Sequence, residues 1–228
     1  MKQQYLIWDL PLRIFHWLLV VAIAGAWYTS EQGSELIDIH MLFGYSIMGL
    51  VLFRVVWGFI GTKYSKFSQF FPSVKRIKDY LRNNKEGSSN YVAGHNPLGS
   101  LAVFAMLALL ILQATSGLFI DDDVFSSGPY YGSVSKSIEK VMSFLHHNVF
   151  DALSILIGLH ILAIVFYRLK KKRNLTKAMI TGKSDAESIN QSDTILHSKL
   201  ITALILALLV SLFVYWLVIY NAPEMEFY

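Results

Sequence analysis

One apolar run, residues 145–168, constrains the fold of this chain more than any other stretch, because it is long enough to cross a lipid bilayer. It carries His146 near one end and His160 further in, 160 − 146 = 14 residues apart. Fourteen steps of about 100° return to within roughly 40° of the starting direction, so both imidazoles lie on one helical face, roughly 21 Å apart along its axis. Ionisable side chains inside a membrane span indicate function. We therefore expect this helix to ligate two stacked metal centres, one near each membrane surface.

The composition is that of an integral membrane protein. Apolar residues make up 54% of the chain and the mean hydropathy is +0.44, which is high for a soluble domain. The absence of cysteine excludes thiolate metal sites, iron–sulfur clusters and covalently attached c-type haem, so any haem is non-covalent and held by His or Met. The net charge of +4 comes from Lys and Arg beside the apolar runs. It indicates topology and contact with the lipid bilayer, not nucleic-acid binding.

The sequence predicts an all-α bundle of membrane-spanning helices. The expected spans are residues 12–28, 40–61, 98–120, 145–168 and 200–220. Between the second and third spans, residues 72–81 have the pattern of a short amphipathic helix lying on the membrane surface. No small-residue cleavage pattern accompanies the first 17 residues, so we expect the first run to be a retained span and not a signal peptide.

Charges of opposite sign alternate between the connections. Lys and Arg concentrate in the second connection, residues 62–97, and in the fourth, after residue 168. Acids dominate the first connection, the tail and the third connection, which opens with Asp121, Asp122 and Asp123. By the positive-inside rule we expect a multi-pass protein of the bacterial inner membrane, with its N-terminus in the cytoplasm and its C-terminus in the periplasm.

Four histidines fall at two levels of this topology. His16 and His160 lie near the cytoplasmic side, whereas His40 and His146 lie near the outer side. Each pair comes from two different helices at one level, as bis-imidazole ligation of a haem between helices requires. We therefore expect two non-covalent b haems, an inner one held by His16 and His160 and an outer one held by His40 and His146.

The other histidines leave alternatives open. His147 is adjacent to His146 but points about 100° away, so we expect it at the surface or behind the ligand, although the two could exchange roles. His95 lies in the cytoplasmic connection, where it is a candidate for a quinone site or a helix cap. His197 precedes the last span and is expected to be solvated.

Arginines and a glycine complete the predicted cofactor site. Arg54 lies 54 − 40 = 14 residues past His40, on a similar face and at the level of the inner haem, and Arg13 lies near the start of the first span. Because guanidinium groups bind carboxylates through a two-pronged contact, both are predicted to pair with haem propionates. The alternative for Arg54 is snorkelling to the headgroups. Gly44, one turn from His40, either lets a porphyrin approach the backbone or reflects ordinary small-residue helix packing.

Several separated motifs occur in a characteristic order. They are WDLPLRIFHW (8–17), HMLFGY (40–45), RVVWGFIGTKYSKF (54–67), GHNPLG (94–99), the spacing of His146 and His160, and NLTKAMITGK (174–183). Together they resemble the bacterial cytochrome b561 family, which includes the cytochrome b subunits of nickel–iron hydrogenases. The resemblance covers about residues 5–183 and implies a four-helix core with two b haems. The family's haem ligands match the four histidines assigned above, and the family exchanges electrons between membrane quinone and an external redox partner.

The fifth span departs from the family core. We expect residues 1–183 to form a cytochrome b561-like di-haem transmembrane domain. Residues 184–228 are then a linker and an additional transmembrane helix, whose role in assembly, partner docking or lipid packing is open.

We interpret the chain as a transmembrane electron carrier between membrane quinone and a periplasmic redox protein, such as a multihaem c-type cytochrome or a hydrogenase. Whether it is an enzyme by itself is left open; we expect the membrane electron-transfer component of a respiratory oxidoreductase. A quinone site is expected beside the inner haem, near His95, Asn96, Arg13 and Arg54. The acidic outer loops are expected to dock a basic patch on the partner.

Two alternatives belong to other classes of protein. Some relatives in the family oxidise superoxide at the outer face and pass the electron to ubiquinone. The outer loops here are acidic, with only Lys136 and Lys140 positive, which disfavours steering of an anion. A haem-free transporter or membrane assembly factor is the other alternative, but the sequence has no internal repeats or broken helices of the transporter kind.

Overall fold

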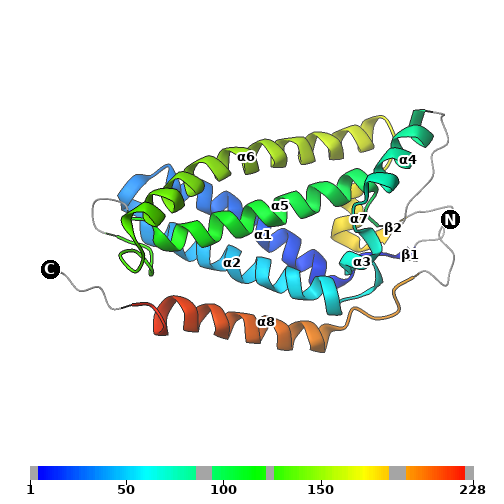
Figure 1. Cartoon of the computed structure of the whole chain (residues 1–228). Coiled ribbons are helices and arrows are strands. Elements are labelled where there is room, and N and C mark those ends of the chain that lie inside the picture. The colour runs from blue at the N-terminus through cyan, green and yellow to red at the C-terminus, as the bar shows by residue number, and fades with distance from the viewer. Residues whose placement is uncertain (1–4, 86–93, 122–125, 185–193, 224–228) are drawn as a thin grey trace. The chain divides into compact units, whose positions relative to one another are not determined.

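The computed structural model describes residues 5–85, 94–121, 126–184 and 194–223 (Figure 1). Five helices in these ranges are long and apolar enough to cross a membrane, namely Leu10–Ser30, Gly33–Ile60, Pro97–Phe119, Lys136–Leu169 and Leu200–Tyr220. The prediction of an all-α membrane protein with a fifth, C-terminal span is confirmed. Asp122, Asp123 and the tail after residue 223 lie outside the described residues.

Short strands and helical turns lie between the long helices. In chain order they are β1 (Tyr5–Leu6), α1 (Leu10–Ser30), η1 (Gly33–Leu36), α2 (Ile37–Ile60), η2 (Lys63–Ser65), α3 (Phe67–Phe70), α4 (Val74–Lys85), α5 (Pro97–Ser116), η3 (Gly117–Phe119), α6 (Lys136–Leu169), α7 (Leu175–Thr181), β2 (Lys183–Ser184), α8 (Leu200–Tyr215) and the π-helical turn η5 (Trp216–Tyr220). β1 and β2 pair antiparallel, with Tyr5 opposite Ser184 and Leu6 opposite Lys183. This pairing joins the start of the chain to the segment that follows α7.

Contacts divide the chain into two units, and each unit contains segments of all five spans. The Arg54 unit comprises Met1–Ile14, Arg54–Met106 and Leu156–Ala203. The His40 unit comprises Phe15–Phe53, Leu107–Ile155 and Leu204–Tyr228. The domain boundary expected at residue 183 is a different division of the chain, and it stays a prediction.

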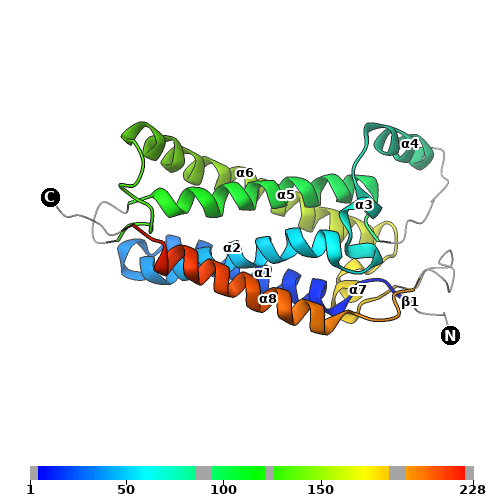
Figure 2. The same cartoon turned by 60° about the horizontal axis from the view of Figure 1, so that its bottom comes forward.

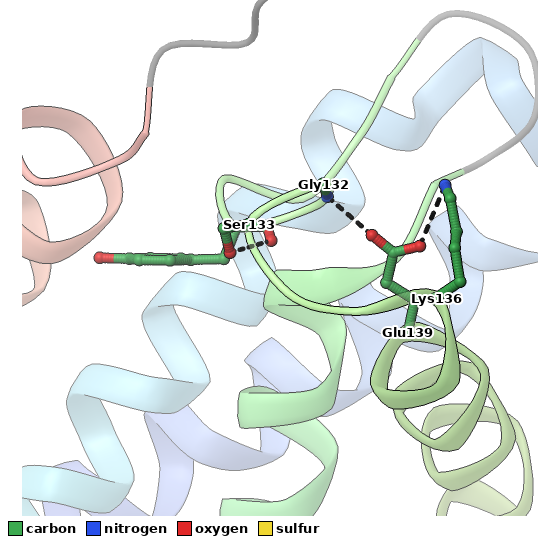
Figure 3. A network of polar contacts seen from close by, with 5 residues as sticks. Gly132, Ser133, Lys136 and Glu139 are labelled. Atoms are coloured by element: carbon green, nitrogen blue, oxygen red, sulfur yellow. Dashed lines mark hydrogen bonds and ion pairs between the residues drawn. The ribbon is translucent and has the colours of Figure 1, made fainter.

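The helix that carries His146 begins at Lys136, nine residues before the start expected for the fourth span (145 − 136 = 9). A contact network ahead of the apolar run explains the extension (Figure 3). The buried carboxylate of Glu139 accepts a hydrogen bond from the Gly132 backbone N–H at 2.9 Å and pairs with Lys136 Nζ at 3.2 Å. An acid in the first turn also interacts favourably with the helix dipole. His146 therefore lies almost three turns inside α6 and not near its end.

Asp9 determines where the first span begins. Its side chain is fully buried, and Oδ1 accepts a hydrogen bond of 2.8 Å from the Leu12 N–H, which is the geometry of a helix N-cap. The carboxylate also accepts hydrogen bonds from Trp57 Nε1 at 3.3 Å, from Thr62 Oγ1 at 2.5 Å and from the Ser65 hydroxyl. These bonds join the start of α1 to the end of α2 and to η2 within the Arg54 unit.

The fifth span packs against α2 within the His40 unit (Figure 2). Met48, Leu118, Val214 and Val218 form one buried apolar cluster. Gly49 faces α8, because a Cβ atom there would make an ordinary van der Waals contact of 3.8 Å with the Val214 side chain. At the end of α8, the Tyr130 hydroxyl donates a hydrogen bond of 2.9 Å to the Leu217 carbonyl. The additional helix is therefore packed on the core helices.

The residues just before α8 bind the ends of two other spans in the Arg54 unit. Lys199 Nζ donates to the carbonyl oxygens of Ile60 and Gly61 at 2.9 and 3.2 Å, where α2 ends. A cation at a helix C-terminus interacts favourably with its carbonyl groups. The Ser198 hydroxyl oxygen accepts a hydrogen bond of 3.3 Å from the Leu10 N–H at the start of α1.

Candidate metal and cofactor site

Two imidazoles from different helices meet in the His40 unit. His40 lies one turn into α2 and His146 lies on α6. Their ring centroids are 6.3 Å apart, their planes make an angle of 78°, and both side chains are half-buried. The structure thus brings together the two residues predicted to hold the outer haem.

Backbone carbonyl groups orient both rings. His40 Nδ1 is 2.8 Å from the Ala26 carbonyl oxygen, and His146 Nδ1 is 3.0 Å from the Gln113 carbonyl oxygen. Because a carbonyl oxygen only accepts, each Nδ1 carries a hydrogen, which leaves Nε2 as the nitrogen available for a metal. Neutral imidazole with a free Nε2 is the form that binds a metal, and a hydrogen bond from Nδ1 is the usual way of orienting it.

The separation of the two rings fits a metal ion between the two Nε2 atoms. Two metal–nitrogen bonds of about 2 Å, together with the distances from each nitrogen to its ring centroid, total roughly 6 Å. The centroids are 6.3 Å apart. A pair of axial imidazoles suits haem iron, whose other ligands are the porphyrin nitrogens. The residues present therefore fit the predicted group.

The structure distinguishes the two adjacent histidines of α6. His147 is exposed, and its Nδ1 donates to the Ser143 carbonyl oxygen of its own helix at 2.8 Å. His146, 6.2 Å away between ring centroids, is the one that lies opposite His40. The geometry therefore favours His146 as the ligand and His147 as a surface residue.

Two glycines border this pair in different ways. A Cβ atom at Gly117 would lie 2.9 Å from Cε1 of His146, so glycine leaves the room that the imidazole occupies. A Cβ atom at Gly44 would meet no described atom within 4 Å. Helix packing therefore does not require glycine at position 44, and open space is what an approaching porphyrin needs. The predicted role of Gly44 at the haem stays a prediction.

Arg54 is a buried cation in the Arg54 unit. Its side chain is only 2% exposed, and its guanidinium carbon lies 4.7 Å from the ring centroid of Phe67 and 5.8 Å from that of Phe70. Among the residues that the structure describes, neither Nη1 nor Nη2 has a hydrogen-bond acceptor. An enclosed guanidinium does not reach lipid headgroups, which disfavours snorkelling. The Asp9 carboxylate interacts with this charge, but the two Nη donors have no acceptor in the described ranges, so they fit an anion such as a haem propionate.

His95 also contacts Phe70, one of the two aromatic rings beside Arg54. Its ring centroid is 4.4 Å from that of Phe70 and 4.8 Å from that of Trp8. Burial, with the charges of Arg54 and His160 adding to it, lowers the pKa of His95 to about 3, so the ring is neutral at physiological pH. Its Nδ1 is buried, and no partner for it occurs within the described ranges. His95 is therefore available to a ligand.

Asn96 has a structural role in addition to any ligand contact. Its Oδ1 accepts a hydrogen bond of 2.8 Å from the Gly99 N–H, so it caps the N-terminus of α5. Its Nδ2 donates to the Tyr167 hydroxyl at 2.9 Å. Capping, which we considered for His95, belongs to its neighbour. The amide nitrogen carries a second hydrogen, so the bond to Tyr167 does not prevent a quinone contact, and the predicted contact stays a prediction.

The remaining predicted residues are not brought together in the same way. His16 belongs to the His40 unit, edge-on to Trp17 at 5.1 Å between ring centroids, whereas His160 is half-buried in the Arg54 unit. Their pairing at an inner haem stays a prediction. Arg13 Nη1 donates to the Ile180 carbonyl oxygen, which links α1 to the end of α7. Its predicted contact with a propionate is untested.

Sequence reasoning assigned no role to Asp9, Gln113 or Gly117. Asp9 has a readable signal, since an aspartate directly before a proline-containing helix start is a typical N-cap. Gln113 acts through its backbone carbonyl, which any residue supplies, so no side-chain pattern reveals it. The role of Gly117 depends on the ring of His146, which approaches from another helix.

Comparisons with known proteins agree with the motifs. The family described as prokaryotic cytochrome b561 matches residues 7–182. The "Probable Ni/Fe-hydrogenase 1 B-type cytochrome subunit" of Escherichia coli (strain K12) is 25% identical over 137 residues, which are 49% of this chain and 57% of that protein. The "Probable Ni/Fe-hydrogenase B-type cytochrome subunit" of Rhizobium leguminosarum bv. viciae is 22% identical over 215 residues, 80% of this chain and 89% of that protein. The match thus spans little more than half of the Escherichia coli relative, and no solved structure matches this chain.

Proposed function

Because the chain belongs to the prokaryotic cytochrome b561 family, we propose that it is a di-haem carrier that relays electrons between membrane quinone and a periplasmic redox partner. Membership of the family and the b-type cytochrome relatives make it a multi-pass membrane protein that binds haem b and transfers electrons. The proposal adds the number of haems, the quinone, the partner and the residues.

The observation that carries the proposal is the pair of imidazoles at the outer centre. The ring centroids of His40 and His146 are 6.3 Å apart, a separation that suits an iron atom held between two imidazoles. Haem b bound there supplies a reversible one-electron centre. With His40 and His146 both holding the iron, the haem would have no site left for oxygen, which favours electron transfer over oxygen chemistry.

The inner centre uses His16 and His160 as ligands. Arg54 supports this assignment, because its buried Nη atoms need an anion and haem carries two carboxylates. Placed beside the propionates, this cation compensates their charge and favours the reduced haem, which has gained an electron.

Quinone binds beside the inner haem in this proposal. His95 is neutral, buried and has an available Nδ1, and Asn96 is next to it at the start of α5. Both residues border aromatic side chains that suit a quinone ring, such as Phe70. Arg13 and Arg54 supply positive charge to this proposed quinone site.

The partner docks on the outer side. The names of the relatives favour a hydrogenase, and a c-type cytochrome is the second candidate. Acids such as Asp38 and Asp121 lie at the ends of spans that carry the outer centre and attract a basic partner. This arrangement places the chain in a bacterial inner membrane, with its N-terminus in the cytoplasm and its C-terminus in the periplasm.

Residues 184–228 form a separate addition to the di-haem domain, 1–183, in this proposal. The contacts of α8 with Met48 and Gly49 favour a role in assembling the core over a role in docking alone.

Haem quantitation and a redox titration of the purified full-length protein test the proposal. We expect two b haems per chain in the pyridine haemochrome assay and two resolved midpoint potentials in the optical titration. A reduced short-chain quinone should then reduce both haems. A preparation with a single haem per chain would refute the di-haem proposal while leaving the family assignment intact.

A further inference from the structure

The surface helix α4 exposes an apolar stripe. Val74, Ile77 and Leu81 recur three and four residues apart, so they lie on one face. Val74 is 70% exposed and Leu81 is 45% exposed, and Phe71 just before the helix is 61% exposed. Ile77 between them is partly buried, and α4 is too short to cross a membrane.

Cations flank the stripe. They are Lys75, Arg76, Lys78 and Arg82, all exposed. Among the described side chains of α4, one ion pair joins Arg82 to Asp79 at 3.9 Å, and both of its side chains are exposed to solvent. Such a pair contributes little. An apolar face bordered by Lys and Arg is typical of a helix that lies in the interface of an anionic bilayer.

A pair of tyrosines holds α4 against a second basic segment. The hydroxyl groups of Tyr80 and Tyr167 are 2.9 Å apart, and Asn96 Nδ2 donates to Tyr167. Tyr167 lies on α6, whose end is followed by a run of cations, Arg168, Lys170, Lys171, Lys172 and Arg173. Arg76 lies one helical turn before Tyr80, and Lys170 lies three residues after Tyr167. Two basic segments far apart in the sequence therefore flank one hydrogen bond.

We propose that α4 and the end of α6 together form a binding site for an anionic phospholipid, with its phosphate between the two basic segments and its acyl chains along Val74, Ile77 and Leu81. The Lys and Arg side chains of both segments attract the negative charge of a phosphate group. A free phosphate ion would satisfy the charges but not the exposed apolar stripe, whereas a phospholipid satisfies both. The site is independent of the proposed electron-transfer function.

Native mass spectrometry of the full-length protein in detergent tests the site. Phosphatidylglycerol or cardiolipin is titrated into delipidated protein, with phosphatidylcholine and inorganic phosphate as separate arms. We expect one anionic lipid to bind at least tenfold more tightly than phosphatidylcholine. Equal binding of the two lipids overturns the proposal, and so does full competition by inorganic phosphate, which would mean an anion site only.

Variants locate the site. The triple variant Lys75→Gln, Lys78→Gln and Arg82→Gln should weaken lipid binding roughly tenfold or more. The matched control removes three cations elsewhere, Lys63→Gln, Lys66→Gln and Lys140→Gln, and should leave binding within about twofold of the unmodified protein. Haem content, read from the Soret band, reports whether each variant is folded. Equal weakening by both triple variants would contradict a specific site.

The tyrosine pair gives a test that leaves the charge unchanged. Tyr80→Phe removes the hydroxyl that joins α4 to Tyr167, while all cations remain. If the two segments act together, lipid affinity should fall several-fold, and Tyr80→Phe in the triple variant should add little. An unchanged affinity in Tyr80→Phe would mean that α4 binds lipid without α6.

Discussion

The two units of the protein differ in the polar side chains that they offer to a bound haem. In the His40 unit the carbonyl oxygens of Ala26 and Gln113 orient the two imidazoles. In the Arg54 unit the side chains are charged: Asp9 is buried with four kinds of hydrogen-bond donor, whereas the buried Arg54 has two Nη atoms without an acceptor in the described ranges.

The polar atoms of the two units therefore differ in whether they have hydrogen-bond partners when no haem is bound. A neutral imidazole with one hydrogen bond made is stable with its other nitrogen free. A buried guanidinium without an anion is destabilising by several kcal/mol. The His40 unit therefore presents ligand atoms, whereas the Arg54 unit presents a charge that calls for a counter-charge.

The largest effect is expected from removing a ligand of the outer centre. His146→Ala should abolish binding of one haem, because iron loses an axial imidazole that His40 alone does not replace. The haem content should fall from two per chain to one in the pyridine haemochrome assay, and one midpoint should vanish from the redox titration. His147→Ala is the matched control and should retain both haems, since His147 is exposed and bonds to its own helix. Loss of haem in the control alone would reverse the assignment.

Removing the unsatisfied charge should have the next largest effect. Arg54→Met should lower the midpoint of the inner haem by roughly 60 mV, since about 1.4 kcal/mol of lost charge interaction corresponds to about 59 mV for one electron. The outer midpoint should move much less. Arg54→Lys keeps the charge but not the two-pronged contact and should give a smaller shift. Equal shifts of both midpoints would mean that Arg54 does not act on one haem.

In the haem-free protein, the same substitution of Arg54 is expected to be favourable and not harmful. Without the cofactor, Arg54→Met removes a buried guanidinium whose Nη atoms have no acceptor in the described ranges, and the variant should have higher thermal stability. The measurement is the unfolding temperature of protein produced under haem limitation. Destabilisation of the haem-free variant would indicate that the guanidinium has a protein partner.

A smaller effect is expected from the two glycines. Gly117→Ala places a Cβ atom 2.9 Å from the His146 ring and should tilt the imidazole, which changes the electron paramagnetic resonance signal of the outer haem while retaining it. Gly44→Ala meets no described atom, so it should leave the haem-free protein as stable as before. If a porphyrin occupies the open space, however, Gly44→Ala should weaken haem binding. Unaltered haem affinity would exclude Gly44 from the site.

The smallest effect concerns the fifth span. Tyr130→Phe removes the hydrogen bond to the Leu217 carbonyl and should destabilise the protein by about 1 kcal/mol without altering either haem spectrum. Thermal unfolding followed at the Soret band measures it. A changed midpoint of the outer haem would instead link α8 to the redox site.

Much of the fold could be predicted because bilayer spans have a strong local signal. Apolar runs of sufficient length located all five spans, and the span bounds differ by a few residues except at the start of α6. That helix extends to Lys136 because Glu139 bonds to Gly132 in the preceding loop, a contact that hydropathy does not record. The family assignment was also predictable, since separated motifs in order are a property of the sequence, and it is confirmed.

The sequence by itself determined the number of spans, the absence of thiolate chemistry and the fourteen-residue spacing of His146 and His160, since these follow from composition and helical periodicity. Only the tertiary structure decided which of two adjacent histidines faces His40, because that depends on how α6 is rotated against α2. It also decided that Asp9 is satisfied and Arg54 is not, because their partners come from segments distant in the sequence. Burial of a side chain and its hydrogen-bond partners depend on contacts between elements. Such contacts cannot be predicted from the local sequence pattern.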